Sequence, residues 1–265
     1  MHRHDIPLTQ DLVLIGGGHA HALVLRKWGM NPLPGARLTV INPGPTAPYT
    51  GMLPGYIAGH YSRETLEIDL VRLCRFAGAR LILSHATGID RTARLVHVED
   101  RAPIAYDVAS FDIGITAKMG IPGFDGFAVG AKPLDVYAKR WRDFLAAVTS
   151  GNIEPEIAVI GGGVAGCELS LAMAHALRSA GIEPRVTLLQ SDPTLSGLGN
   201  RARHTVEAKL RGAKVTLRTG IRVTEIAADH VVLGSGDKIR SPVSYTHLRA
   251  HETSLHLVCR LLLEK

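Results

Sequence analysis

Short apolar runs, each followed by glycines and then by a helical pattern, recur along the chain. Residues 12–15 (LVLI) are wholly apolar, which is typical of a strand buried on both faces of a parallel sheet. Three glycines follow, and residues 19–28 then place apolar side chains at helical spacing. The next apolar run, 36–42, completes a strand–helix–strand unit. Such a unit predicts an α/β fold built on a doubly wound parallel sheet.

The same order of elements returns about 145 residues later. Residues 156–160 form an apolar run, glycines follow, a helical pattern extends to residue 181, and residues 185–190 predict the next strand. The chain therefore contains one supersecondary unit twice, in tandem. A turn-rich connection at 121–127 is the predicted boundary between a first domain, 1–120, and a second domain, 121–241.

The segments between the two units give weaker signals. Residues 43–61 contain four prolines and four glycines, so we expect a long shaped loop there, of the kind that is often functional. Other segments predict regular elements: a helix at 67–78, a strand hairpin at 79–99, a strand at 110–117 and a helix at 133–151.

The two glycine segments carry the candidate chemistry. Gly161, Gly163 and Gly166 complete the pattern G-x-G-x-x-G, whereas His21 stands where the first segment, with Gly16 and Gly18, should have its third glycine. The first glycine allows a tight turn, the second lets the backbone approach a pyrophosphate, and the third lets the helix pack closely on the strand. Since each segment follows a strand and opens a helix, both predict Rossmann-like dinucleotide sites on helix N-termini.

The acidic residue expected at the end of the second strand is absent from both units. Asn42 and Gln190 occupy these positions. A carboxylate there accepts hydrogen bonds from a ribose diol, while an amide can accept with only one oxygen. We expect a similar but weaker ribose contact from Asn42, and Gln190 leaves the choice between NADH and NADPH open.

Composition narrows the function classes. The chain is 46% hydrophobic and 20% charged, with a net charge of +6 that is spread without a basic block, so nucleic-acid binding is not expected. There is no run of 18 apolar residues and no apolar leader, which predicts a cytoplasmic protein. The cysteines, Cys74, Cys167 and Cys259, have neither disulfide nor metal spacing, so no metal site is expected.

Residues 10–240 resemble the two-dinucleotide-binding flavoproteins of the pyridine nucleotide–disulfide oxidoreductase superfamily. The stretches LVLIGGGHAHALVL, PYTGMLPGYIAGHY, YDVASFDIGIT and VGAKPLDVYAKRW are most similar to the type II NADH dehydrogenase-like group, which includes the flavoprotein module fused to selenide, water dikinase. The resemblance implies FAD on the first unit, NAD(P)H on the second, and hydride transfer from nicotinamide to flavin and on to a quinone-like acceptor. It also implies peripheral membrane association and a homodimer for the full-length parent.

The resemblance assigns cofactor-binding roles but no catalytic residue. The residues near FAD would be Gly16, Gly17, Gly18, His19, Asn42, Tyr49 and Pro54. Tyr49 to Pro54 would pass near the isoalloxazine, and His19 would contact phosphate or only start the helix. The residues near NAD(P)H would be Gly161, Gly163, Gly166, Glu168 and Gln190, with Glu168 towards the nicotinamide end. No cysteine pair follows the second strand, so a thiol relay is not expected.

The last residues do not follow the rhythm of the rest. Residues 242–253 (PVSYTHLRAHET) can be written as codons that look like the transposase adapter used in sequencing-library preparation, and 257–265 (LVCRLLLEK) can be written as its flow-cell end. We therefore expect residues 242–265 to be a non-native tail on a C-terminally truncated fragment. Two other interpretations remain open: a flavoprotein module serving a selenide, water dikinase, and an inactive truncated nucleotide-binding fragment.

Overall fold

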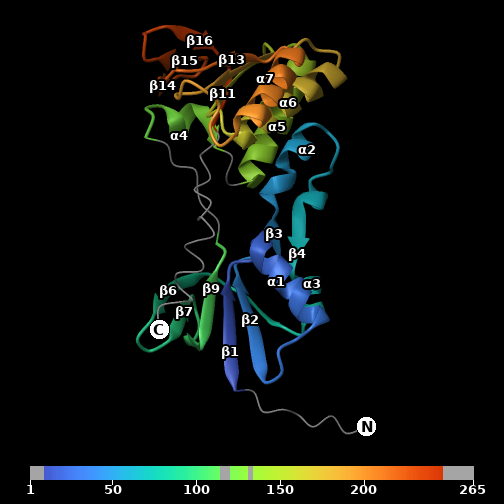
Figure 1. Ribbon diagram of the computed structural model, residues 1–265, viewed down its shortest axis with the longest axis vertical. Helices are drawn as coiled ribbons and strands as arrows, with labels where there is room; N and C mark the ends of the chain where they lie inside the picture. The colour runs from blue at the N-terminus through green and yellow to red at the C-terminus, as the bar shows by residue number, and fades with distance from the viewer. Residues whose placement is uncertain (1–8, 114–119, 131–133, 247–265) are drawn as a thin grey trace. The chain divides into compact units, whose positions relative to one another are not determined.

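The computed structural model describes residues 9–113, 120–130 and 134–246. These residues divide into two compact units (Figure 1). Unit 1 contains residues 9–56 and 61–113, and unit 2 contains residues 57–60, 120–130 and 134–246. The predicted first domain, 1–120, is therefore interrupted, because residues 57–60 group with unit 2.

Unit 1 is built on a four-stranded parallel sheet in the order β5-β2-β1-β9. Its strands are β1 (Gln10–Ile15), β2 (Ala36–Asn42), β5 (Arg80–Leu83) and β9 (Val108–Phe111). The last four residues of β1 are apolar, and the last five residues of β2 are buried, because both faces of the sheet are covered. The carboxyl ends of β1 and β9 lie together, with Ile15 paired to Phe111.

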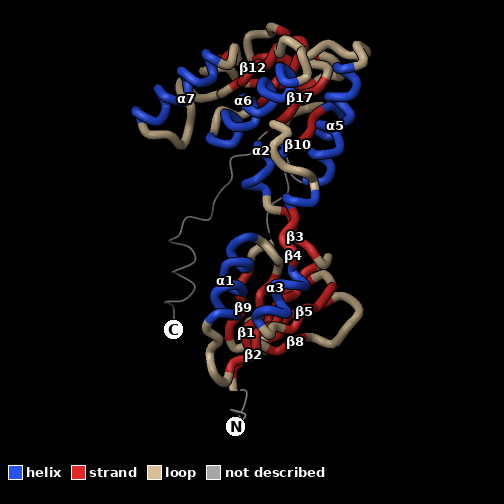
Figure 2. The backbone as a smooth tube through the Cα atoms, turned by 90° about the vertical axis from the view of Figure 1, so that its right-hand side faces the viewer, coloured by secondary structure: helices blue, strands red, loops and turns tan. Residues whose placement is uncertain are grey.

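Two different layers cover this sheet. The helices α1 (His19–Met30) and α3 (Leu70–Ala77) cover one face, where Leu25, Leu70 and Cys74 join one apolar core with Leu14 and Val40. The other face packs against an antiparallel sheet of β6 (Ala86–Asp90), β7 (Leu95–Val98) and β8 (Ile104–Ala105). Figure 2 shows α1 and α3 over the strands of this unit.

The proline- and glycine-rich segment is more ordered than the predicted loop. It holds β3 (Thr46–Pro48), a single 3-10 turn (Thr50–Met52) and the short helix α2 (Leu53–Ile57). β3 pairs with β4 (Glu67–Asp69), and a second 3-10 turn, Glu64–Leu66, precedes β4. The prediction of a loop was wrong here because Pro54 falls in the first turn of α2, where a helix needs no proline N–H.

Unit 2 repeats the plan with a five-stranded parallel sheet in the order β10-β17-β11-β12-β13. The strands are β10 (Ala128–Gly130), β11 (Glu156–Ile160), β12 (Arg185–Leu189), β13 (Thr216–Arg218) and β17 (Val243–Thr246). The helices α5 (Leu134–Thr149), α6 (Val164–Ser179) and α7 (Asn200–Gly212) lie together in Figure 1.

The second face of this sheet is again covered by strands. α4 (Phe124–Phe127) and an antiparallel sheet of β14 (Val223–Ile226), β15 (His230–Leu233) and β16 (Lys238–Arg240) share an apolar core with Ala158, Ile160 and Leu189. The predicted α/β fold with two tandem Rossmann-like units is thus confirmed. In each unit a small antiparallel sheet takes the place that a second layer of helices has in many doubly wound folds.

The sheet of unit 2 extends past the predicted end of its domain at residue 241. β17 lies between β10 and β11, pairing Ile157 with Val243 and Ile160 with Thr246. The side chain of Tyr245 is 1% exposed. Val, Thr and Tyr are strand-forming residues whatever their origin, so four residues of the expected tail complete the sheet. Residues 247–265 lie outside the described part of the chain.

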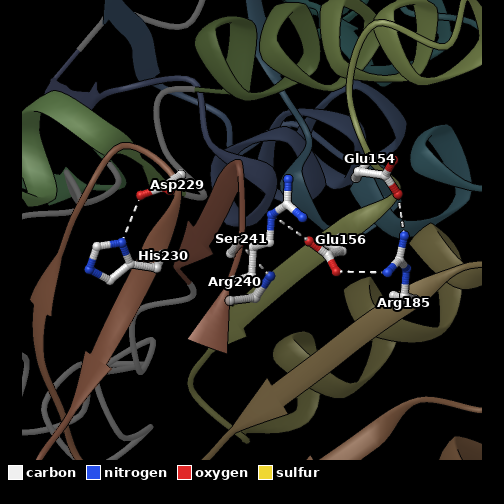
Figure 3. Close-up of polar contacts among 8 residues, drawn as sticks. Glu154, Glu156, Arg185, Asp229, His230, Arg240 and Ser241 are labelled. Carbon is white, nitrogen blue, oxygen red and sulfur yellow. Dashed lines mark hydrogen bonds and ion pairs between the residues drawn. The ribbon is translucent and has the colours of Figure 1, made fainter. Parts of the chain in front are cut away.

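A cluster of charges joins the antiparallel sheet of unit 2 to its parallel sheet (Figure 3). Glu156 on β11 pairs with Arg185 at 2.9 Å and with Arg240 at 3.3 Å. Next to it, the Ser241 hydroxyl accepts a hydrogen bond from the Ala158 N–H at 2.9 Å. Only 14% of the Glu156 side chain is exposed, so this carboxylate links β16 to β11 and β12 at the ends remote from the glycine segment.

None of the helices in the described ranges is both long and apolar enough to cross a membrane. Within the same ranges, no group of three or more His, Cys, Asp or Glu side chains has an arrangement that could hold a metal ion.

Candidate functional site

The first glycine segment turns sharply between β1 and α1. Gly16 has φ +89°, and its N–H donates to the Ile41 carbonyl at 2.8 Å. The N–H of Gly17 donates to Oδ1 of Asn42 at 2.9 Å, in a buried position. Nδ2 of Asn42 donates to the Gly44 carbonyl at 2.7 Å. The Asn42 amide therefore ties the glycine turn to the loop that follows β2.

The second segment has the same construction between β11 and α6. Gly161 has φ +113°, and its N–H donates to the Leu189 carbonyl at 2.8 Å. The N–H of Gly162 donates to Oε1 of Gln190 at 2.8 Å, and Nε2 of Gln190 donates to Oδ2 of Asp192 at 2.9 Å. Gln190 thus does in unit 2 what Asn42 does in unit 1.

We call this arrangement the amide lock. Asn42 and Gln190 lie at the end of the second strand, as predicted, and both ends of each amide also bond the protein. A carbonyl-type oxygen has two lone pairs, so each amide oxygen can accept one further hydrogen bond, as a ribose contact requires. Whether these residues contact ribose stays a prediction.

The third position of the pattern differs between the units. A Cβ atom on Gly166 would stand 1.8 Å from the Gly161 carbonyl oxygen, so no larger residue fits while α6 stays in place. The Ser170 hydroxyl donates to the Gly166 carbonyl at 2.7 Å. Unit 2 therefore needs its third glycine for close packing of the helix on the turn.

His21 fills the third position in unit 1. Its ring is 2% exposed, with Nδ1 2.7 Å from the Gly16 carbonyl and Nε2 2.9 Å from the Ser110 hydroxyl. Because a carbonyl only accepts, Nδ1 carries the proton and Nε2 accepts from Ser110. Burial lowers the pKa of His21, against the opposing effects of the Gly16 hydrogen bond and Asp112. His21 is thus a neutral bridge inside unit 1.

Asp112, just after β9, occupies the N-terminus of α1. Its Oδ2 accepts from the N–H of Ala20 at 2.9 Å and from the N–H of His21 at 3.1 Å. A Cβ atom on Gly18 would meet the Asp112 carboxyl group at 2.4 Å. The space that the second glycine leaves for a pyrophosphate in a dinucleotide site is therefore taken by this carboxylate.

In the part of the chain that the structure describes, the N-terminus of α6 differs from that of α1. The N-cap residue of α6 is Gly163, at φ −75° and ψ 178°, which as a glycine has no side chain to cap the helix. A Cβ atom on Gly163 would have the Ser196 hydroxyl as its nearest described neighbour, at 3.9 Å. First-turn N–H groups at such an end attract a phosphate. The residues of unit 2 consequently fit a dinucleotide pyrophosphate as they stand.

The other predicted FAD contacts lie in unit 1. His19 begins α1 with an exposed side chain, and its ring centroid is 5.9 Å from that of Tyr49. Tyr49 is 39% exposed. The structure therefore brings His19 and Tyr49 together beside the first glycine segment. Pro54 is half-buried in the first turn of α2.

Glu168 and the two described cysteines sit on helices. Glu168 is exposed in the second turn of α6. Cys167 and Cys74 are each 2% exposed, and burial raises the pKa of each thiol to about 11. Neither thiol is ionised near neutral pH, and disulfide exchange requires a thiolate. The burial of these two thiols therefore disfavours a relay through them, and the absence of a thiol relay stays a prediction. Cys259 lies outside the described residues.

Sequence reasoning missed Asp112 and Ser110. Both belong to the stretch SFDIGITA, which was predicted as a strand, and residues 114–117 of it lie outside the described part. The parallel pairing of Ile15 with Phe111 brings both side chains to the first glycine turn. An aspartate directly after a strand next to β1 is a usable signal, but only once that strand order is known.

Comparisons with known proteins agree with this construction. Residues 10–246 match the family described as pyridine nucleotide-disulphide oxidoreductase. The chain is 30% identical over 173 residues to an NADH dehydrogenase-like protein of Mycobacterium tuberculosis, a match covering 62% of this chain and 43% of that protein. It is 28% identical over 169 residues to an NADH dehydrogenase-like protein of Bacillus subtilis, covering 61% and 44%. The chain thus spans less than two thirds of these relatives' length.

Solved structures share the fold. The sulfide:quinone oxidoreductase of Aquifex aeolicus superposes with a TM-score of 0.75 at 19% identity, over 90% of this chain and 58% of the other. The NDH2 of Plasmodium falciparum, solved in complex with NADH, gives 0.74 at 16% identity, over 89% and 54%. At these identities the likeness supports the architecture alone.

Proposed function

Since the chain belongs to the pyridine nucleotide-disulphide oxidoreductase family, we propose that it forms part of an FAD-dependent NAD(P)H oxidoreductase of the NADH dehydrogenase-like kind. The observation that carries this proposal is the amide lock, which is built twice at the turn from a first strand into a helix. Two equivalent turns in one chain would supply the two nucleotide sites that a flavin enzyme using a nicotinamide requires.

The two units have separate roles in this proposal. Gly161, Gly163 and Gly166 would hold the NAD(P)H pyrophosphate on α6, with Gln190 at the ribose and Glu168 towards the nicotinamide. In unit 1 the FAD contacts would come from the residues already named: Gly16, Gly17, Gly18, His19, Asn42, Tyr49 and Pro54. The chemistry that these cofactors supply when bound is hydride transfer from nicotinamide to flavin.

A quinone-like molecule is the proposed electron acceptor. Both described thiols are buried and protonated near neutral pH, which argues against a disulfide as the group that receives electrons. Two structural neighbours are a sulfide:quinone oxidoreductase and an NDH2. A cytoplasmic location, peripheral membrane association and a homodimer of the parent stay part of this proposal.

Two observations favour a second candidate. Asp112 occupies the pyrophosphate position of α1, and the chain covers only 43% of the Mycobacterium tuberculosis relative. Both facts are compatible with a fragment that binds a nicotinamide nucleotide on unit 2 without turnover. Such a fragment would bind NADH and would show no flavin absorbance after incubation with FAD.

The test compares two glycines that begin helices with ordinary backbone angles. Gly163 begins α6 and Gly199 begins α7, with φ −75° and −67°. NADH binding to the chain is measured by fluorescence, and NADH oxidation by FAD and a soluble quinone is measured by absorbance. We expect Gly163→Ala to weaken NADH binding at least tenfold, because the methyl group intrudes where the pyrophosphate approaches, and Gly199→Ala to bind as the wild type does. Equal binding by both variants would remove NAD(P)H from unit 2.

A further inference from the structure

The two helix N-termini differ in charge, and the difference bears on how FAD binds. In unit 1, Asp112 bonds the N–H groups of Ala20 and His21, while its backbone carbonyl accepts from the Gly18 N–H at 3.3 Å. In unit 2, the N-cap residue of α6 is Gly163, and a Cβ atom there would have only the Ser196 hydroxyl, at 3.9 Å, as a near described neighbour. The N-terminus of α1 thus already binds an anion from its own unit, the Asp112 carboxylate.

The position of Asp112 makes it a competitor of a phosphate rather than a neighbour. A helix N-terminus offers its first-turn N–H groups to an anion, and Asp112 already bonds two of those groups on α1. Its carboxyl group also stands 2.4 Å from the place of a Gly18 Cβ atom. A pyrophosphate on the same N–H groups would meet a second negative charge, which opposes binding.

We propose that Asp112 is a specificity-determining residue of unit 1, whose carboxylate must leave the N-terminus of α1 before a dinucleotide pyrophosphate takes its place. The inference rests on the proposed function, because it concerns FAD binding to unit 1. Unit 1 is then a low-affinity site for any diphosphate that does not displace the Asp112 carboxylate. Affinity there depends on what the rest of the flavin contributes to displacing Asp112.

Asp112→Asn tests the proposal because the amide oxygen can still cap Ala20 and His21 while the charge is removed. The matched control is Asp107→Asn. Oδ2 of Asp107 accepts from the Asp11 N–H at 2.7 Å, at the opposite end of β1. Five residues along a strand separate the two aspartates by about 16 Å, so the control removes the same charge far from the glycine turn.

FAD binding to each purified chain is measured by quenching of flavin fluorescence, and NADH binding is measured in parallel. We expect Asp112→Asn to bind FAD about tenfold more tightly, since removal of a like charge at close range is worth at least that factor. The gain should shrink in high salt, where charges are screened. Asp107→Asn should bind FAD as the wild type does, and NADH binding should be the same in all three chains.

The outcomes separate this inference from the proposed function. If the wild type binds FAD and neither Asp112→Asn nor Asp112→Ala binds it more tightly, Asp112 is only a helix cap and the inference is overturned. If no chain binds FAD while NADH still binds, the flavin part of the proposed function fails and the inference fails with it. Asp112→Ala covers the case in which the asparagine keeps the carboxylate's position, because it clears the space beside Gly18. Its folding is checked by thermal unfolding.

Discussion

The two glycine turns have the same backbone construction and differ in the side chains at the third position and at the helix N-terminus. Both use an amide from the end of the second strand to hold the middle glycine, at 2.9 Å in unit 1 and 2.8 Å in unit 2. Unit 1 then adds two polar side chains, His21 at the third position and Asp112 at the helix N-terminus. Unit 2 keeps glycine at both places: Gly166 is packed against the Gly161 carbonyl, and only Gly163 has open space beside it. In our proposals, this shared turn holds a nucleotide in each unit, and the side chains at these two places determine how readily a phosphate binds.

The largest effect should come from adding a side chain where unit 2 has none. Gly166→Ala places a methyl group 1.8 Å from the Gly161 carbonyl oxygen, so α6 must shift. We expect the free energy of unfolding of unit 2 to fall by about 3 kcal/mol, the upper range for overpacking a buried site. Urea unfolding followed by circular dichroism measures this. Gly163→Ala, with 3.9 Å to its nearest described neighbour, should change stability by less than about 0.5 kcal/mol.

Equal losses in these two variants would mean that the third glycine has no special packing role in unit 2. The comparison with His21 would then have no structural basis.

The next effect concerns the residue that replaces the third glycine in unit 1. His21→Ala removes hydrogen bonds to Gly16 and Ser110 and leaves a cavity beneath α1. We expect a loss of about 2 kcal/mol in the stability of unit 1, measured by the same unfolding experiment. His21→Gly, which restores the pattern of unit 2, should lose at least as much, because unit 1 is built around the ring.

The pH dependence of unit 1 gives a second measurement on His21. Burial lowers the pKa of His21 in the folded chain, so below about pH 6.5, the ordinary histidine pKa, the unfolded chain binds more protons. The stability of unit 1 should therefore fall as the pH decreases from 7 towards 5. His21→Ala should show a smaller fall, and an unchanged slope would contradict a buried neutral ring.

The strand, turn and helix of each unit could be predicted from the sequence because they depend on residues that are close together along the chain. The apolar runs before Gly16 and Gly161 predicted parallel strands, and the glycines predicted turns. The side-chain contacts at the two turns could not be predicted in the same way. Asp112 lies 92 residues from Ala20, and only the pairing of β1 with β9 brings them together. Likewise, nothing local shows that Asn42 and Gln190 turn their amides towards the glycines.

The strands next to β1 and β11 offer a further comparison. β9 pairs with β1 in unit 1, and β17 pairs with β11 in unit 2. Asp112 follows β9 directly, while the residue after β17 is His247, outside the described residues. If residues 242–265 are foreign, the residue that naturally follows this strand is not the one in this chain. Sequencing the source locus across codons 230–300 would identify it.

A smaller effect is expected in β17 itself. The hydroxyl groups of Tyr245 and Tyr137 are buried with no hydrogen-bond partner among the described residues, and their rings lie 5.0 Å apart. A buried hydroxyl without a partner is unfavourable. Tyr245→Phe should therefore leave unit 2 equally stable or stabilise it by up to about 1 kcal/mol, as measured by thermal unfolding. A clear loss would show that the Tyr245 hydroxyl has a partner and belongs in this strand.

The smallest difference between the two units is expected at their buried cysteines. Cys74 in unit 1 and Cys167 in unit 2 are each 2% exposed, and burial raises the pKa of both thiols to about 11. At pH 8 about one thiol in a thousand is then ionised, against roughly a quarter in an unfolded chain with a thiol pKa of about 8.5. In a Cys259→Ser background, iodoacetamide should label the folded chain at least about 100-fold more slowly than the unfolded chain.

The same thiols predict a stability change at high pH. Above pH of about 8.5 the unfolded chain releases thiol protons that the folded chain keeps, so stability should decrease as the pH rises towards 11. Replacing Cys74 should remove this decrease from unit 1 alone, and replacing Cys167 should remove it from unit 2 alone. Fast labelling of Cys167 only, at pH 8, would mean that the helix beside the second glycine turn opens. Unit 2 would then be the less rigid of the two units, and its open N-terminus would reflect motion rather than a site ready for phosphate.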